Sequence, residues 1–129
     1  MKSIIWFRND LRVDDNPAMR AAFDNSTEVH AIFLYSQDQL EDHNEANVKI
    51  DFLIDNLKCL SDSLEELNVP LTIINSKGFH EDPEIILKTT KERDAGKLFF
   101  NKQFGENEQK RDKEVTNILE AFGIKTESF

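Results

Sequence analysis

Five short apolar segments alternate along the chain with segments in which apolar residues recur every three or four positions. The apolar segments run from Ser3 to Arg8, Glu28 to Tyr35, Leu71 to Asn75, Lys97 to Asn101 and Ile124 to Ser128. Strands that alternate with helices are typical of a parallel sheet with helices on its faces. The pattern therefore predicts a three-layer α/β fold built on a five-stranded parallel sheet.

The segment from Glu28 to Tyr35 contains the uninterrupted run Ala31-Ile32-Phe33-Leu34-Tyr35. It does not alternate between polar and apolar residues, as a strand with one solvated face would. A strand buried on both faces needs no polar face, and we therefore expect this strand in the centre of the sheet.

Four helices are expected between the strands. The first begins at Pro17, with Asn16 as its N-cap, and ends near Asn25. The second and longest runs from about Glu45 to Leu67. Its apolar residues lie three or four apart and form a stripe that we expect to cover the sheet, namely Ile50, Leu53, Ile54, Leu57, Leu60, Leu64 and Leu67.

The third helix is expected from Pro83 to near Gly96. The fourth carries Val115, Ile118, Leu119 and Phe122 and stops at Gly123, because glycine is favoured just after a helix end. There is no internal repeat, low-complexity tract or linker. The 129 residues are enough for one domain, and we assign residues 1–129 to it.

The charge balance bears on the partners of the chain. Sixteen basic and 25 acidic residues give a net charge of −9, which repels the phosphates of DNA. We expect no DNA binding by this domain alone.

The single cysteine, Cys59, cannot form an internal disulfide and is expected to be a buried apolar residue, which fits a cytoplasmic location. The apolar start of the chain is too short for a signal peptide or a membrane span, so no membrane association is expected.

Most common catalytic and binding motifs are absent. The glycines at positions 78, 96, 105 and 123 form neither a dinucleotide-binding loop nor a P-loop. The three histidines are scattered and suggest no metal site, and no serine lies in a nucleophile elbow. We therefore predict no catalytic residue and no metal in this chain.

The sequence from Trp6 to Ala18, WFRNDLRVDDNPA, joins a buried strand to a helix through a polar turn. Arg8, Asp10 and Arg12 follow the carboxyl end of the strand, where open α/β sheets bind ligands. We interpret these three residues as a local cluster of ion pairs and hydrogen bonds that shapes the turn. Trp6, the only tryptophan, is expected in the core.

This run, together with His43-Asn44 and Asn107-Glu108-Gln109-Lys110-Arg111-Asp112, resembles the start of the DNA photolyase/cryptochrome family. The resemblance covers essentially the whole chain and implies a Rossmann-like domain with strand order 3-2-1-4-5. Family members also carry a helical C-terminal domain that holds FAD and the damaged DNA. The implied role is that of the antenna-binding N-terminal domain of a deoxyribodipyrimidine photolyase or a cryptochrome, which packs against that flavin domain and is inactive in repair by itself.

The resemblance also implies a binding site. In folate-type photolyases, residues that match His43, Asn107 and Glu108 line the site of the antenna 5,10-methenyltetrahydrofolate. Because such relatives complete the site with groups from the second domain, we expect only weak binding by this domain alone. A carboxylate accepts hydrogen bonds from the amino group and ring N–H of a pterin. Without the resemblance, Asn107 and Glu108 would be read as part of the acidic first turn of the fourth helix. Lys102 and Gly105 stand where many relatives have bulkier residues, and an 8-hydroxydeazaflavin antenna remains the alternative.

Two other classes of protein are compatible with this architecture. One is a stand-alone nucleotide-binding domain, although the expected glycine-rich phosphate loop is missing between Lys113 and Phe122. The other is an interaction domain without a ligand.

FAD is expected only in a full-length parent. An exposed domain interface, near Arg8 to Val13 or after Phe104, predicts weak self-association.

Overall fold

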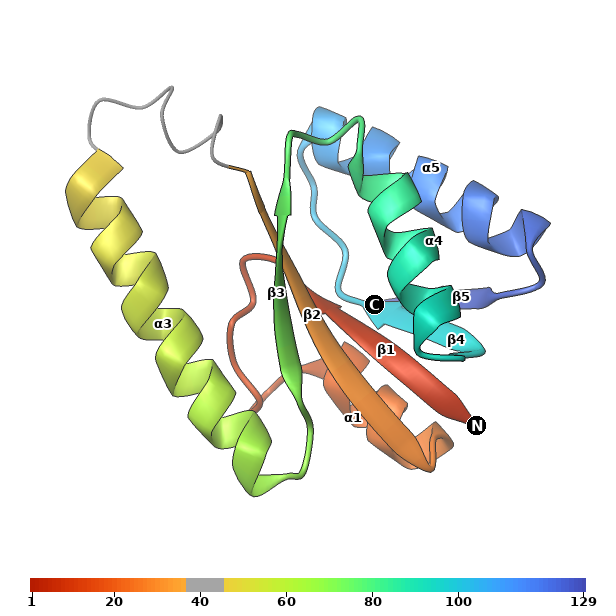
Figure 1. The fold of residues 1–129 in the computed structure, drawn as a ribbon, viewed down its shortest axis with the longest axis horizontal. Helices are drawn as coiled ribbons and strands as arrows, with labels where there is room; N and C mark the ends of the chain where they lie inside the picture. The colour runs from red at the N-terminus through yellow and green to blue at the C-terminus, as the bar shows by residue number, and fades with distance from the viewer. Residues whose placement is uncertain (37–45) are drawn as a thin grey trace.

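The computed structural model describes residues 1–36 and 46–129 and shows a five-stranded parallel sheet (Figure 1). The strand order is β3-β2-β1-β4-β5, as predicted. In chain order the elements are β1 (Lys2–Phe7), α1 (Pro17–Asn25), β2 (Glu28–Ser36), α3 (Ala46–Glu66), β3 (Leu71–Ser76), α4 (Asp82–Glu92), β4 (Lys97–Phe100), α5 (Glu106–Ala121) and β5 (Lys125–Ser128).

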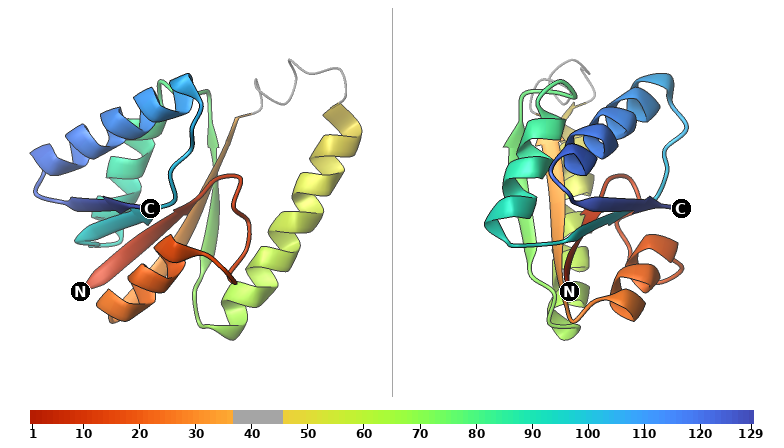
Figure 2. Two further views of the ribbon diagram at one scale, coloured as in Figure 1. Left: turned by 180° about the vertical axis from the view of Figure 1, so that it is seen from behind. Right: turned by 90° about the vertical axis from the view of Figure 1, so that its right-hand side faces the viewer.

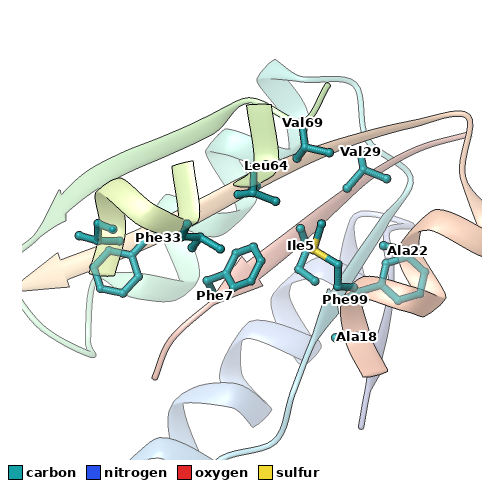
Figure 3. Packing of buried hydrophobic residues seen from close by; sticks show 13 residues of the cluster. Ile5, Phe7, Ala18, Ala22, Val29, Phe33, Leu64, Val69 and Phe99 are labelled. Carbon is teal, nitrogen blue, oxygen red and sulfur yellow. The ribbon is translucent and has the colours of Figure 1, made fainter. Parts of the chain in front are cut away.

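Helices cover both faces of the sheet, with α1 and α3 on one side and α4 and α5 on the other (Figure 2). Side chains that alternate along β1 supply both cores. Ile5 and Phe7 pack with α1 and α3, as Figure 3 shows, whereas Ile4 and Trp6 pack with α4 and α5. All four are at most 1% exposed, which confirms that Trp6 is a core residue.

The central strand is β1, which corrects the expectation that the segment from Glu28 to Tyr35 occupies the centre. That segment forms β2, an interior strand between β1 and β3. Ala31, Ile32 and Phe33 are buried, as expected for a strand covered on both faces. The chain adds β3 beyond β2 and then crosses back to add β4 and β5 beside β1. This crossover moves the centre to the first strand.

The helix ends follow the predicted signals. The side-chain oxygen of Asn16 accepts a hydrogen bond from the backbone N–H of Met19 at 3.1 Å, which caps α1. After α5, Gly123 has a φ of +76°, and the N–H of Ile124 donates to the carbonyl of Leu119 at 3.0 Å. This is the arrangement in which a left-handed residue ends a helix and satisfies its last carbonyls.

Fewer residues of the predicted apolar stripe on α3 are buried than expected. Leu57, Leu60 and Leu64 are buried, but Ile54 is 44% exposed. Leu67, just beyond the end of the helix, is 46% exposed. Cys59 is exposed, which corrects the expectation that it is buried. Successive residues of a helix are rotated by about 100°, so Cys59 lies well off the line through Leu57, Leu60 and Leu64.

Candidate functional site

A cavity of about 690 Å³ opens at the carboxyl ends of the first three strands. Helix α3 forms one side of it, and the segments that lead into α4 and α5 form the other. Aromatic side chains make up much of the wall, contributed by Trp6, Phe33, Tyr35, Phe52 and Phe79. Carboxyl ends of parallel strands are the usual location of ligand sites in open α/β sheets.

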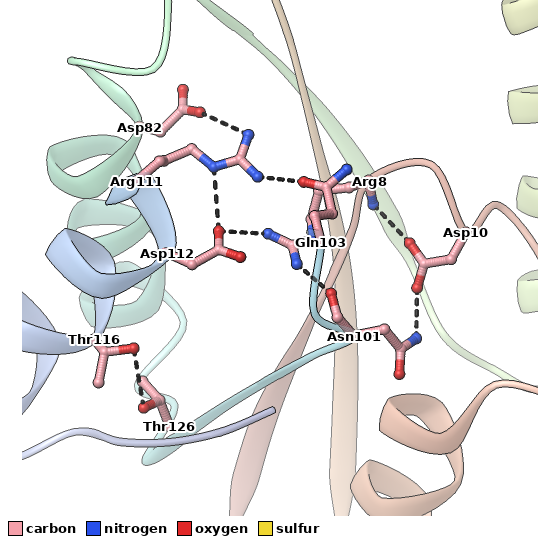
Figure 4. A network of polar contacts seen from close by, with 9 residues as sticks. All are labelled: Arg8, Asp10, Asp82, Asn101, Gln103, Arg111, Asp112, Thr116 and Thr126. Carbon is pink, nitrogen blue, oxygen red and sulfur yellow. Dashed lines mark hydrogen bonds and ion pairs between the residues drawn. The ribbon is translucent and has the colours of Figure 1, made fainter. Parts of the chain in front are cut away.

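Arg8 forms part of the cavity lining at the end of β1 and is 7% exposed. Its guanidinium donates to Oδ1 of Asp112 at 2.7 Å and to the backbone carbonyl of Asn101 (Figure 4). The same guanidinium lies 4.4 Å from the ring centre of Trp6 and 4.8 Å from that of Phe100. An ion pair and two cation–π contacts therefore hold Arg8 in one position.

Arg111 also binds the carboxylate of Asp112. Its Nε donates to Oδ1 of Asp112 at 3.2 Å, and its guanidinium lies 4.9 Å from the ring centre of Trp6 and 4.3 Å from that of Phe79. Burial lowers the pKa of Arg111, and the charge of Asp112 opposes this effect. Two buried guanidinium groups thus share the carboxylate of Asp112 beside the cavity.

Asp82 is the second buried carboxyl group of this network and is 4% exposed. It accepts a hydrogen bond from the hydroxyl of Ser76 at 2.6 Å and lies 3.8 Å from the guanidinium of Arg111. Burial raises the pKa of Asp82, and this effect outweighs the opposing Ser76 hydrogen bond and Arg111 charge. Asp82, which lines part of the cavity, is therefore a carboxyl group whose ionised form is disfavoured.

The predicted cluster of Arg8, Asp10 and Arg12 is only partly local. Oδ1 of Asp10 accepts the backbone N–H of Arg8 at 2.9 Å, and Oδ2 accepts the side-chain amide of Asn101 at 2.5 Å. Asp10 therefore shapes the turn, as expected. The guanidinium of Arg8, however, pairs with Asp112 on α5. The prediction of a purely local ion-pair cluster is wrong, because the fold brings α5 to the end of β1.

The family model for DNA photolyase matches residues 3–129. The chain belongs to the DNA photolyase family. Curated members of this family are similar along nearly the whole chain. It is 33% identical over 129 residues to the deoxyribodipyrimidine photo-lyase of Buchnera aphidicola, covering 99% of this chain and 27% of the relative. It is 32% identical to cryptochrome-1 of Arabidopsis thaliana, covering 98% of this chain and 18% of the relative.

Solved structures show the same fold in this family. The cryptochrome of Synechocystis sp. PCC6803 superposes with a TM-score of 0.87 and 18% identity, over 100% of this chain and 27% of that one. The photolyase of Sulfolobus tokodaii gives a TM-score of 0.85 and 22% identity, over 100% and 29%. The chain thus spans about a quarter of these photolyases and cryptochromes, and it corresponds to their N-terminal domain.

Of the three site residues predicted from the photolyase resemblance, the structure describes Asn107 and Glu108, and these two border different spaces. Glu108 lines the cavity. Asn107, its neighbour on α5, lines an adjoining hollow of about 440 Å³. Phe79 and Arg111 border both spaces. His43 lies outside the described residues, so its place at the site stays a prediction.

Sequence reasoning missed several residues that shape this photolyase-family cavity, among them Phe52, Phe79 and Asp82. Phe52 lies on α3, and the other two lie in or next to the loop between β3 and α4. No motif in the sequence marks them as part of a site. By contrast, the motifs that carry the family resemblance contain Trp6, Arg8, Glu108, Arg111 and Asp112. Arg8 and Asp112 nevertheless come from segments distant in the chain.

Two general features complete the description of this domain. Within residues 1–36 and 46–129 there is no group of three or more His, Cys, Asp or Glu side chains placed to hold a metal ion. No helix in the same residues is long and apolar enough to cross a membrane.

Proposed function

We propose that this chain is the antenna-chromophore-binding domain of a photolyase or cryptochrome and that the cavity at the carboxyl edge of the sheet receives the chromophore. The observation that supports this most directly is the combination of aromatic walls with a carboxylate, Glu108, in one cavity. Its volume of about 690 Å³ lies within the usual range for small-molecule sites.

The residues of the cavity fit a planar conjugated molecule. Aromatic side chains offer stacking surfaces to such a ring system. Glu108 offers a charged acceptor for the amino group and ring N–H of a pterin, and charge assistance strengthens these hydrogen bonds. Arg8 and Arg111 are engaged with Asp112, so they serve as a rigid border of the site rather than as free charges for the ligand.

The favoured ligand is 5,10-methenyltetrahydrofolate, held by Glu108 with Asn107 and His43 as further contacts. Because Asn107 lines the adjoining hollow, it would meet a folate that extends past the first turn of α5. When bound, the chromophore supplies light absorption and transfer of excitation to the flavin of the parent protein. The domain supplies a fixed position and orientation for it.

A second candidate is an 8-hydroxydeazaflavin or another flavin-type antenna in the same cavity. The Sulfolobus tokodaii photolyase, which shares the fold, is described with two FAD molecules and with the implication of a novel light-harvesting cofactor. The cavity of this chain is large enough to receive a ring system of that class. Titration with both chromophores therefore belongs in the test.

The role of the whole protein is also part of the proposal. The parent would be a deoxyribodipyrimidine photolyase or a cryptochrome whose C-terminal domain binds FAD. This chain alone would not repair DNA, and its net charge of −9 disfavours binding to a phosphate backbone. Phe104, which is 85% exposed, belongs to a surface that would pack against the flavin domain or self-associate weakly. A cytoplasmic location is proposed as well.

The test is the substitution Glu108→Gln, assayed by the absorbance and fluorescence of bound 5,10-methenyltetrahydrofolate. The change keeps the size of the side chain but replaces a charged acceptor with an amide. Loss of a charge-assisted hydrogen bond should cost about 1.5–3 kcal/mol, or roughly ten- to a hundredfold in affinity. Asn107→Ala and His43→Ala should weaken binding less, because their contacts are neutral.

Glu106→Gln is the matched control, since Glu106 also lies in the acidic first turn of α5 but does not border the cavity. It should leave the affinity for the folate nearly unchanged. If the folate binds with the same affinity to the Glu108→Gln variant while its circular dichroism spectrum is native, Glu108 is only a helix-start residue and the folate assignment fails. Tighter binding of 8-hydroxydeazaflavin than of the folate would favour the second candidate.

A further inference from the structure

Glu108 occupies an unusual position at the start of α5. It is the third residue of the helix, and its side chain turns back over Gly105, the N-cap residue. A methyl group on Gly105 would overlap the carboxylate, with the carboxyl carbon of Glu108 only 2.6 Å away. The carboxylate thus lies in space that is open only because residue 105 has no side chain.

This position favours the carboxylate for an electrostatic reason. The first N–H groups of a helix have no partners within the helix, and they carry a partial positive charge. Gly105 provides no side-chain cap for them. A glutamate at the third position of a helix commonly folds back toward the N-cap. Glu108 therefore places a second negative charge at this helix end, beside that of Glu106.

Glu108 also borders the cavity, together with Gln103 and Arg111. It is only half-buried, so its side chain has room to rotate. A carboxylate turned back over Gly105 directs part of its acceptor capacity toward the helix end and offers less of it to a molecule in the cavity. The helix end and a ligand would then compete for one acceptor.

We infer that Gly105 sets the affinity of the cavity for its ligand by offering Glu108 a resting position on the N-terminus of α5. The inference rests on the proposed function, since it takes Glu108 as the ligand acceptor. A side chain at position 105 closes the resting position. The backbone does not oppose this change, because the φ of Gly105 is −63° and suits any residue.

Gly105→Ala should therefore bind 5,10-methenyltetrahydrofolate more tightly than the unchanged chain. The interaction of a carboxylate with a helix N-terminus corresponds to about a two- to fivefold change in an equilibrium constant, and this is the expected gain. The gain should vanish when Glu108→Gln is added. An affinity for the folate that is unchanged or lower in a folded Gly105→Ala variant would overturn the inference.

A second measurement needs no ligand. Glu108→Gln should lower the melting temperature of the unchanged chain by about 1–4 °C, but it should have little effect in the Gly105→Ala background, where the carboxylate no longer rests on the helix end. Glu106→Gln serves as the control, because its effect on the melting temperature should be the same in both backgrounds.

The two measurements separate the possible failures. Equal effects of Glu108→Gln on the melting temperature in both backgrounds, with folate binding still dependent on Glu108, would overturn the role of Gly105 and leave the proposed function standing. Folate binding that ignores Glu108 would overturn the proposed function and the control by Gly105 together, even if the melting temperatures show that the carboxylate rests on the helix.

Discussion

Asp112 is the residue whose loss should damage this domain most for the smallest change in size. Its Oδ1 accepts from Arg8 at 2.7 Å and from Arg111 at 3.2 Å, and all three side chains are at most 12% exposed. The substitution Asp112→Asn keeps the volume but removes the negative charge. Arg111 would keep Asp82 at 3.8 Å and the side chain of Gln103. Arg8 would keep no carboxylate, only the carbonyl of Asn101 and the rings of Trp6 and Phe100.

The expected cost follows from leaving a buried charge without its partner. Removing one member of a buried ion pair typically costs about 3–5 kcal/mol of folding free energy. A domain of this kind has a total stability of about 5–15 kcal/mol, so Asp112→Asn should consume a large part of it. Replacing Arg8 as well removes one of the orphaned charges. Arg8→Met with Asp112→Asn should therefore cost less than the sum of the two single changes, by about 0.5–3 kcal/mol.

Urea denaturation provides the assay, with Trp6 as the reporter. Trp6 is the only tryptophan of the chain and lies against both guanidinium groups. Asp14→Asn is the matched control, because Asp14 is exposed and its change should stay within about 0.5 kcal/mol. A loss below 1 kcal/mol for Asp112→Asn, with an unchanged denaturant slope, would refute the argument that the two arginines depend on this carboxylate.

Two further outcomes are expected. Because the folded pKa of Asp82 is raised, the folded state binds more protons than the unfolded state from pH ~4 upward, so stability falls as pH rises through the folded pKa. Asp82→Asn should remove this contribution to the pH dependence of stability. If the melting temperatures of both proteins change with pH in the same way between pH 3.5 and 7, this expectation is contradicted. The chain should also purify without FAD and show no light-dependent dimer repair, and flavin that survives gel filtration in equal molar amount would contradict that outcome.

The order of elements and most of their ends could be predicted from the sequence, because these depend on local chemistry. Asn16 and Pro17 specify the start of α1 through a side-chain cap and a preset backbone angle, and Gly123 ends α5 through its positive φ. The parallel sheet follows from apolar segments that alternate with amphipathic ones. The strand order came from the family resemblance, since local periodicity contains no information on which strands lie side by side.

The candidate site depended on the tertiary structure. Arg8 and Asp112 are 104 positions apart, and nothing in the local sequence of either indicates that they pair. The exposure of Cys59 was equally hidden, because burial depends on where the sheet meets α3 and not on the apolar neighbours of a residue. Asn107 and Glu108 are adjacent in the sequence yet border different spaces, since successive helical residues point about 100° apart. Which of them faces the cavity was decided by how α5 docks on the sheet.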